Sequence, residues 1–328
     1  MSEARAYFLV GGAGFIGGHF VDRLMSQADV SRVTVYDNFS SGREWRLERH
    51  LDAPRLHVVR GDAGDLPALS TAMQGHDTVI HLASNPDIAR AATEPAIDFD
   101  QGTYLTHNVV EAMRITGAAQ ILYASGSGVY GDLGELEIDE DHGPLVPIST
   151  YGASKLAGEA LISAYSHMFG LHGCVYRFAN VVGDRQTHGV GFDFLRQLDS
   201  SAGRLRILGD GTQSKSYIHV GDVIDAVLLA ADAPGAPRFR TYNVGTADYI
   251  TVREIAELAV ECMGLPVGGT EFVYAGGDRG WAGDVPVVRL STERIRALGW
   301  RNQMTSKEAL RASMQGMLAD AASGRLWA

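Results

Sequence analysis

Short hydrophobic runs alternate with helical patterns through the first half of the chain. The runs cover residues 6–10, 32–36, 56–59, 78–83, 120–125 and 171–178, and they are rich in Val, Ile and Leu. Hydrophobic strands that alternate with helices are typical of βαβ units. The pattern therefore predicts an α/β fold, with a doubly wound parallel sheet.

The pattern becomes looser from about Asn180. Glycine-rich loops such as GDGTQ separate shorter strands and helical segments, among them DVIDAVLLAA and TVREIAELAVECM. We expect two domains: a first domain over residues 1–179, and a smaller C-terminal α/β lobe over residues 180–328. The lobe should face the substrate and be partly interleaved with the last strands of the sheet.

Composition excludes several classes of protein. The 328 residues are 45% hydrophobic, and no apolar run approaches the roughly 20 residues that span a bilayer. The net charge of -11 argues against binding to nucleic acid or an anionic membrane. Neither Cys174 nor Cys262 lies in a metal-binding cluster, so we expect buried thiols, a reducing compartment and no metal. With no signal peptide in view, we expect a cytoplasmic protein.

A glycine-rich segment joins the first predicted strand to the first predicted helix. Its glycines fit the dinucleotide fingerprint either as Gly12, Gly14 and Gly17 or as Gly11, Gly14 and Gly17. Glycine permits the tight turn that lets a pyrophosphate approach the helix N-terminus. Asp37 follows Gly17 by twenty residues and ends the second strand. An acidic residue there binds ribose hydroxyls and repels a 2′-phosphate, which predicts NAD rather than NADP.

The segment STYGASK places Tyr151 and Lys155 one helical turn apart, on the same face of a predicted helix. The spacing alone fits two interpretations. One is an ordinary amphipathic helix start, and the other is a general acid/base beside the cation that tunes its pKa.

Nine motifs together resemble the extended short-chain dehydrogenase/reductase family of sugar-nucleotide epimerases and dehydratases. They are GGAGFIG, YDNFSSG, RGDAGD, HLAS, ASGSGVYG, YGASK, RFANVVG, GDGTQSKSYIHVGDV and DRGWAGDVP. The resemblance covers nearly the whole chain and is greatest to the UDP-hexose 4-epimerases, including those that act on UDP-glucuronate. It implies a Rossmann fold and a homodimer formed through the helices that start near Gly102 and Tyr151.

The resemblance also implies a set of cofactor-binding residues. Asp62 should meet the adenine amine. Asn38, Ser40 and Gly42 should surround the adenosine ribose and phosphate. The full set comprises Gly11, Gly14, Phe15, Ile16, Gly17, Asp37, Asn38, Ser40, Gly42, Asp62, Ala63, Leu82, Ala83, Ser84, Tyr151 and Lys155.

By the same resemblance, Tyr151 is the catalytic acid/base. Lys155 should favour the phenolate and hold the nicotinamide ribose, while Tyr151 takes the proton of the sugar 4-hydroxyl and a 4-keto sugar forms. The family's Ser or Thr that bonds the 4-oxygen is replaced by Gly126. Ser127 or Ser125 could take its place, with Ser127 preferred, or both satisfy only local backbone groups.

The same loop bears on the reaction type. The family's 4,6-dehydratases and UDP-glucuronate decarboxylases carry acidic residues where Ser127 and Gly128 stand here. Their absence favours 4-epimerisation of UDP-glucose/galactose or UDP-glucuronate/galacturonate. Two alternatives stay open: another NAD-dependent nucleotide-sugar enzyme (a 4,6-dehydratase, decarboxylase or reductase), and a non-catalytic NAD-binding protein.

Candidate residues for binding the UDP-sugar lie in the second half of the chain. Lys215 and Arg279 are the candidate cations for the diphosphate. Phe194 and Leu208 either sandwich the uracil or belong to the core. His219 could act as a base, but a hydrogen bond within the lobe is the simpler role for it. The full substrate set is Asn180, Phe194, Leu208, Lys215, Tyr217 and Arg279.

Overall fold

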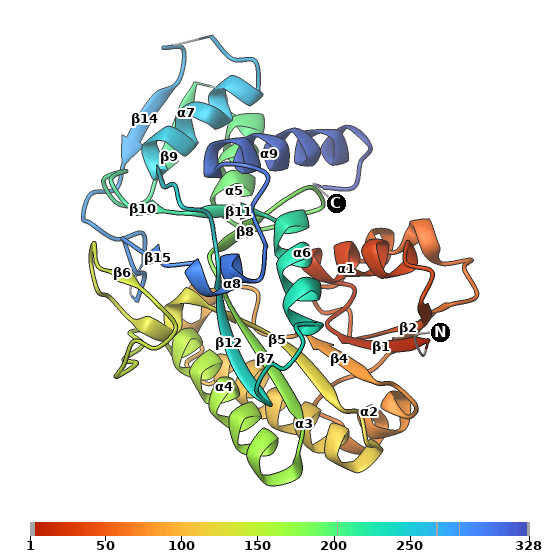
Figure 1. Cartoon of the computed structure of the whole chain (residues 1–328). Coiled ribbons are helices and arrows are strands. Elements are labelled where there is room, and N and C mark those ends of the chain that lie inside the picture. Colours follow the sequence, from red (N-terminus) through yellow and green to blue (C-terminus); the bar gives the residue numbers. More distant parts are fainter. Residues whose placement is uncertain (1–3, 202, 267, 282, 327–328) are drawn as a thin grey trace. The chain divides into compact units, whose positions relative to one another are not determined.

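The computed structural model describes residues 4–201, 203–266, 268–281 and 283–326 (Figure 1). The chain forms two compact units. The first unit comprises Met1–Val129, Thr150–Arg177 and Val227–Tyr242, and the second comprises Tyr130–Ser149, Phe178–Ala226 and Asn243–Ala328. A junction between residues 177 and 178 lies close to the domain boundary expected from the sequence. Residues 130–149 and 227–242, however, group with the opposite unit from the one that this boundary assigns.

A seven-stranded sheet organises the first unit, in the order β12-β7-β5-β4-β1-β2-β3. The pairings of β1 with β2, β1 with β4, β2 with β3 and β4 with β5 are parallel. This arrangement confirms the predicted doubly wound α/β fold. The strands are β1 (Arg5–Val10), β2 (Val30–Asp37), β3 (Leu56–Arg60), β4 (Thr78–His81), β5 (Gln120–Gly126), β7 (His172–Phe178) and β12 (Phe239–Val244).

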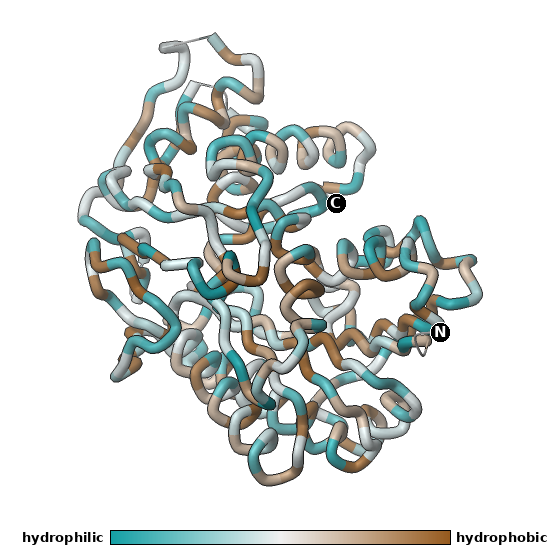
Figure 2. The backbone as a smooth tube through the Cα atoms, viewed as in Figure 1, coloured by the Kyte–Doolittle hydropathy of each residue, from teal (hydrophilic) through white to brown (hydrophobic). Residues whose placement is uncertain are grey.

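Helices cover this sheet and bury its apolar residues. They are α1 (Phe15–Met25), α2 (Leu66–Met73), α3 (Tyr104–Thr116), α4 (Thr150–Phe169) and α6 (Val220–Ala231). Val109 and Met113 of α3 and Ile162 of α4 pack with Ile121 and Val175 of the strands, all fully buried. Figure 2 shows hydrophobic segments concentrated along these strands. The short turns η1 (Glu44–Arg46), η2 (Glu48–His50), η3 (Ile88–Ala92), η4 (Phe99–Thr103) and η5 (Ser127–Tyr130) join the larger elements.

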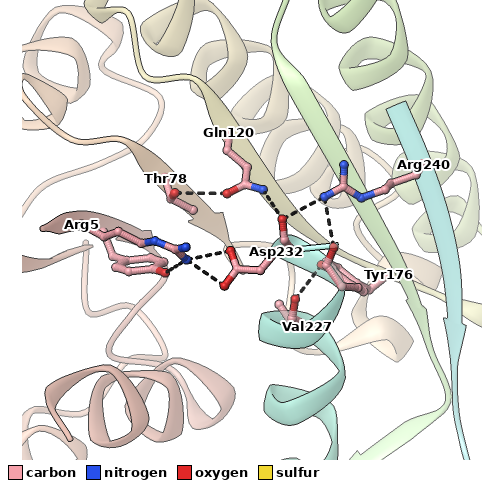
Figure 3. Close-up of polar contacts among 10 residues, drawn as sticks. Arg5, Thr78, Gln120, Tyr176, Val227, Asp232 and Arg240 are labelled. Atoms are coloured by element: carbon pink, nitrogen blue, oxygen red, sulfur yellow. Dashed lines mark hydrogen bonds and ion pairs between the residues drawn. The ribbon is translucent and has the colours of Figure 1, made fainter. Parts of the chain in front are cut away.

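The end of α6 is fastened to the sheet by side chains that bond its last carbonyl groups (Figure 3). Gln120 and Arg240 donate to the carbonyl of Ala231, at 2.9 and 3.0 Å. The Tyr176 hydroxyl donates to Val227, at 2.8 Å. The last four carbonyl groups of a helix have no partner within it, so Gln120 and Arg240 satisfy that of Ala231, whereas the carbonyl of Val227, one turn earlier, gains an additional donor. The contacts explain why residues 227–242 belong to the first unit.

The second unit is built from short strands and four helices around its own apolar core. Its strands are β6 (Glu137–Ile138), β8 (Asn180–Val182), β9 (Arg204–Ile207), β10 (Ser214–Lys215), β11 (Tyr217–His219), β13 (Ile250–Thr251), β14 (Glu271–Tyr274) and β15 (Arg289–Leu290). Its described helices are α5 (Val190–Ser200), α7 (Val252–Cys262), α8 (Glu293–Ala297) and α9 (Ser306–Ala322). Capping boxes at Thr251 and Thr305 begin α7 and α9. Among the described residues, no helix has the length and apolar character to cross a membrane.

Candidate functional site

The turn between β1 and α1 has the close backbone contacts that a dinucleotide fingerprint requires. Gly11 has a φ of +81°, and a Cβ there would lie 2.7 Å from the backbone nitrogen of Ala83. A Cβ on Gly17 would lie 2.5 Å from the carbonyl oxygen of Gly12. The helix begins at Phe15, and the N-cap residue Gly14 makes no side-chain cap. Its first N–H groups are therefore suited to an anion such as a pyrophosphate.

Asp37 joins the end of β2 to this turn. Its Oδ2 accepts from the backbone nitrogen of Ala13 at 2.9 Å, and its Oδ1 accepts from that of Phe39 at 2.8 Å. Asp37 therefore also caps the backbone of the two neighbouring loops. This does not exclude ribose binding, because each carboxylate oxygen can accept a second hydrogen bond.

Two further strand ends meet at the same edge of the sheet. Asn38 donates to the Asp62 carboxylate at 3.1 Å and accepts from the backbone nitrogen of Ser40 at 3.0 Å. Leu82 and Ala83 both donate to the carbonyl of Val10, at 2.9 and 3.0 Å. The structure therefore brings the expected cofactor residues from β1, β2, β3 and β4 to the carboxyl ends of the strands, where open α/β sheets bind ligands.

Lys155 of α4 is buried, with 4% of its surface exposed. Its Nζ donates to the carbonyl of Ala124 at 2.8 Å and lies 5.5 Å from the centroid of the Tyr151 ring. The ammonium therefore sits against the ring face. Ser84 provides the hydrogen bond to the Tyr151 side chain. The structure therefore brings together the Tyr–Lys pair expected from the sequence.

Burial dominates the acid–base properties of this pair. It lowers the pKa of Lys155 to about 8, against the opposing negative charges of Asp98 and Glu159. It raises the pKa of Tyr151 to about 12, with the Ser84 hydrogen bond opposing it and the charge of Asp98 adding to it. In the protein alone, burial therefore keeps Tyr151 a neutral phenol at neutral pH, and the role of Lys155 in favouring the phenolate stays a prediction. Desolvation of the phenolate is the largest cause of this shift.

The two candidate serines have different surroundings. The Ser125 hydroxyl donates to Glu159 at 2.6 Å, and Glu159 forms a buried ion pair with Arg177 at 2.7 Å. Ser127 begins η5 and is partly buried, and its hydroxyl has no hydrogen-bond partner within the described part of the chain. Ser125 is thus engaged by the protein, which supports Ser127 as the group for a substrate oxygen.

The sequence analysis missed Glu159 and Asp98. Glu159 could have been found, because it follows Lys155 at the same four-residue spacing as Lys155 follows Tyr151. Asp98 carries no such signal, since it is more than fifty positions from Tyr151 in the chain.

In the second unit, the two candidate cations are both paired with carboxylates. Lys215 Nζ lies 2.6 Å from Asp284 Oδ1, and Arg279 lies 2.6 Å from Asp132. Arg279 also donates to the backbone carbonyl of Asp284 at 2.8 Å. The structure brings the two cations together around Asp284, and any bound anion would compete with these carboxylates.

The other substrate candidates lie in varied environments. Asn180 is exposed and donates to the carbonyl of Ser216 at 3.3 Å. Phe194 and Tyr217 are 4% and 7% exposed and belong to the core of the second unit, whereas Leu208 is 51% exposed. This favours the core role for Phe194 over a uracil sandwich. His219 accepts from the backbone nitrogen of Gly221 at 3.1 Å, in keeping with a local hydrogen-bonding role.

Comparison with known proteins gives the family. The model of the NAD dependent epimerase/dehydratase family matches residues 7–245. The chain belongs to this family.

Relatives within the family include both epimerases and dehydratases. The UDP-glucose 4-epimerase of Mycolicibacterium smegmatis is 32% identical over 315 residues, covering 94% of this chain and 96% of that protein. A crystal structure of a UDP-galactose 4-epimerase is 34% identical, with a TM-score of 0.85 over 96% of this chain and 99% of that one. A double mutant of dTDP-glucose 4,6-dehydratase from Streptomyces venezuelae, solved with NAD, is 25% identical, with a TM-score of 0.88 over 97% and 98%. The family and fold expected from the sequence are therefore confirmed, while the relatives do not distinguish the reactions.

The residues present fit the NAD of this family. The β1–α1 turn offers the first N–H groups of α1 without a side-chain cap, and close backbone contacts at Gly11 and Gly17 that need glycine. Asp37 stands at the strand end where ribose hydroxyls are bound, and its negative charge disfavours a 2′-phosphate. The described residues contain no cluster of His, Cys, Asp and Glu that could hold a metal ion.

Proposed function

We propose that this protein is an NAD-dependent 4-epimerase of a UDP-hexose, either UDP-glucose/galactose or UDP-glucuronate/galacturonate. The proposal depends mainly on the loop at the end of β5. Residues 125–128 are Ser-Gly-Ser-Gly, so the loop has no carboxylic acid with which to protonate a leaving hydroxyl. The carboxylate that contacts it, Glu159, is already bonded to Ser125 and Arg177.

Each residue at the end of the sheet has a role in this proposal. Tyr151 takes the proton of the sugar 4-hydroxyl and later returns one to the 4-oxygen. Ser127 donates to that oxygen, and Lys155 would hold the nicotinamide ribose. NAD supplies the chemistry of accepting a hydride from C4 and returning it to the opposite face. The cofactor residues named above would bind its adenosine, pyrophosphate and ribose groups.

The acid–base state of Tyr151 fits a base that is active only when the site is complete. With a pKa of about 12, the residue is a neutral phenol at physiological pH. A cationic nicotinamide nearby would favour the phenolate and add to the charge of Lys155. The base would thus be generated where the hydride acceptor is bound.

Lys215 and Arg279 would bind the diphosphate by exchanging their present carboxylate partners for phosphate oxygens. Arginine offers a planar fork to phosphate, and lysine a point charge. Asp132 and Asp284 are the carboxylates that the phosphate oxygens would displace.

The direct test is to incubate the purified protein with UDP-glucose, UDP-glucuronate and UDP-N-acetylglucosamine, and to read the products by NMR. Inversion at C4 with the rest of the sugar unchanged is the expected result. A 4-keto-6-deoxy product would identify a dehydratase. This is the second candidate reaction, because a dTDP-glucose 4,6-dehydratase is among the similar structures. Loss of CO₂ from UDP-glucuronate would identify a decarboxylase. No turnover with NAD bound would favour a non-catalytic protein.

We also infer a cytoplasmic homodimer. The paired helices α3 and α4 pack together in the first unit, and large apolar side chains remain exposed on them and on η4. These are Phe99 at 59%, Tyr104 at 45%, Ile115 at 54%, Met168 at 72% and Phe169 at 47%. Burying these side chains against a second copy would remove them from water. Sedimentation analysis of wild type and a Met168→Glu variant tests the assembly, and an unchanged monomeric mass in both would contradict it.

A further inference from the structure

A buried carboxylate touches the start of the catalytic helix. Asp98 lies directly before η4, a single π-helical turn that leads into α3, and it is 1% exposed. Its Oδ2 accepts from the Thr150 hydroxyl at 2.7 Å, and its Oδ1 accepts from the Asn85 amide at 2.9 Å. Thr150 is the first residue of α4, so the carboxylate fixes the helix where the Tyr151–Lys155 pair begins.

A second contact of the same residue holds the next turn. The Ser154 hydroxyl donates to the backbone carbonyl of Asp98 at 2.7 Å, and Thr103 donates to Ser154 at 3.1 Å. A Cβ on Gly102 would overlap the Ser154 oxygen, so glycine leaves room for this contact. Thr150 and Ser154 are one turn apart on α4, and each immediately precedes a member of the catalytic pair.

The side-chain partners of Asp98 are neutral, whereas Glu159, the other buried acid near the pair, is bonded to Arg177. The charged or titratable groups that act on Tyr151 and Lys155 are Asp98 before η4, Glu159 of α4, His81 of β4 and Tyr123 of β5. Arg177 neutralises Glu159, while burial and the nearby Lys155 lower the pKa of His81 to about 3, leaving it uncharged. Both side-chain partners of Asp98 are uncharged, so its negative charge is not cancelled locally.

We propose that Asp98 is a positioning residue for the catalytic pair: it anchors the first turn of α4 and keeps Lys155 an ammonium in a buried site. The desolvation of Lys155 favours the neutral amine, and a negative charge nearby opposes this. Only the consequence for turnover rests on the proposed function.

The chain offers a direct readout, because it contains only three lysines, Lys155, Lys215 and Lys307. NMR of the full chain labelled with ¹³C at the lysine Cε reports each ammonium separately, and Lys155→Met assigns the signal. In wild type, Lys155 should titrate near pH 8. In Asp98→Asn, which keeps the shape and loses the charge, it should titrate at least about one pH unit lower. Asp98→Ser serves as a second neutral variant if Asn impairs folding.

The matched control is Thr150→Val, which removes a hydrogen bond to Asp98 and keeps the charge. Its Lys155 titration should stay within about 0.3 units of wild type, because the carboxylate charge remains. An unchanged titration in both neutral variants would overturn the proposal. So would an equal shift in Thr150→Val, since that would assign the effect to structure rather than charge.

The pH dependence of kcat/KM with a turned-over UDP-sugar extends the test. If the lysine pKa falls from about 8 to about 7, the charged fraction at pH 8 falls about fivefold and at pH 6 hardly changes. The kcat/KM of Asp98→Asn, divided by that of wild type, should be about fivefold lower at pH 8 than at pH 6. A purely structural defect would instead lower kcat/KM equally at both pH values. Failure to epimerise any sugar would refute the proposed function and leave the lysine titration to decide the role of Asp98.

Discussion

The two buried or half-buried lysines of this protein are held in opposite ways. Lys155 of the first unit donates to a backbone carbonyl and has no carboxylate in direct contact among the described residues. Lys215 of the second unit is paired with Asp284 at 2.6 Å. In the first arrangement, burial lowers the pKa of the lysine and the charges of Asp98 and Glu159 raise it. The second holds the lysine against one carboxylate, which another anion could replace.

The difference suits two kinds of chemistry. In the proposed function, Lys155 belongs to a pair whose protonation matters for catalysis, and Lys215 provides a contact to phosphate. The following predictions test this division, from the largest expected effect to the smallest.

Tyr151→Phe should reduce epimerisation by about 10²–10⁴-fold, because it removes the only atom that moves the proton and keeps the ring. NAD binding and thermal stability should be nearly unchanged. Tyr165→Phe is the matched control: it lies on the same helix and loses a hydrogen bond to Glu111, so full activity is expected. Wild-type turnover by Tyr151→Phe on the true substrate would refute the central assignment.

Lys155→Met should abolish activity and yet stabilise the fold at neutral pH. A pKa of about 8 instead of 10.5 in the unfolded chain corresponds to a burial cost of up to about 3.5 kcal/mol, at about 1.4 kcal/mol per unit. Methionine fills similar space without this cost, although it leaves the Ala124 carbonyl unpaired. Chemical denaturation at pH 7 measures the change, and a large destabilisation would show that the ammonium is not penalised.

In the wild-type protein, the cost of burying the Lys155 ammonium should appear as a change of stability with pH. The unfolded chain binds the Lys155 proton more tightly than the folded one, so this group makes stability rise between pH 8 and 10.5. Tyr151 acts in the opposite sense at higher pH, because its pKa of about 12 exceeds the ordinary value of 10. Its contribution is lost as the pH rises from 10 to 12. Lys155→Met should lack the first rise.

Arg279→Ala should weaken UDP-sugar binding about ten- to a hundred-fold, with a smaller effect on the rate of the bound complex. A charge-assisted hydrogen bond contributes about 1.5–3 kcal/mol, and this one is present in both ground and transition states. Isothermal titration with UDP-glucose gives the dissociation constant. An unchanged constant would place Arg279 outside the site.

Asp132→Asn is the companion variant, since Asp132 is the acidic side chain that holds Arg279 at 2.6 Å. If phosphate must displace this carboxylate, affinity should rise a few-fold. A fall in affinity would instead show that Asp132 positions the arginine for binding.

Ser127→Ala and Ser125→Ala should separate catalysis from stability. Loss of one hydrogen bond to the 4-oxygen corresponds to about 1 kcal/mol or more, so Ser127→Ala should lower kcat about tenfold and leave stability unchanged. Ser125→Ala should mainly lower stability, because it deprives the buried Glu159 of a donor. The reverse outcome would exchange the roles of the two serines.

The sequence by itself determined the features that depend on neighbouring residues. The hydrophobic runs gave six strands of the sheet, the glycines and Asp37 marked the dinucleotide turn, and the spacing of Tyr151 and Lys155 placed both on one helix face. Each depends on backbone geometry over a few residues, and local geometry is encoded locally.

Only the tertiary structure decided the charges and contacts. Asp98 and Thr150 are far apart in the chain, yet the Thr150 hydroxyl lies 2.7 Å from Asp98 Oδ2. No sequence pattern in either segment predicts this contact. Burial of Phe194 in a core and the raised pKa of Tyr151 likewise follow from what packs around them. Desolvation and charge act through space, so the state of a catalytic group is a property of the folded surroundings rather than of its motif.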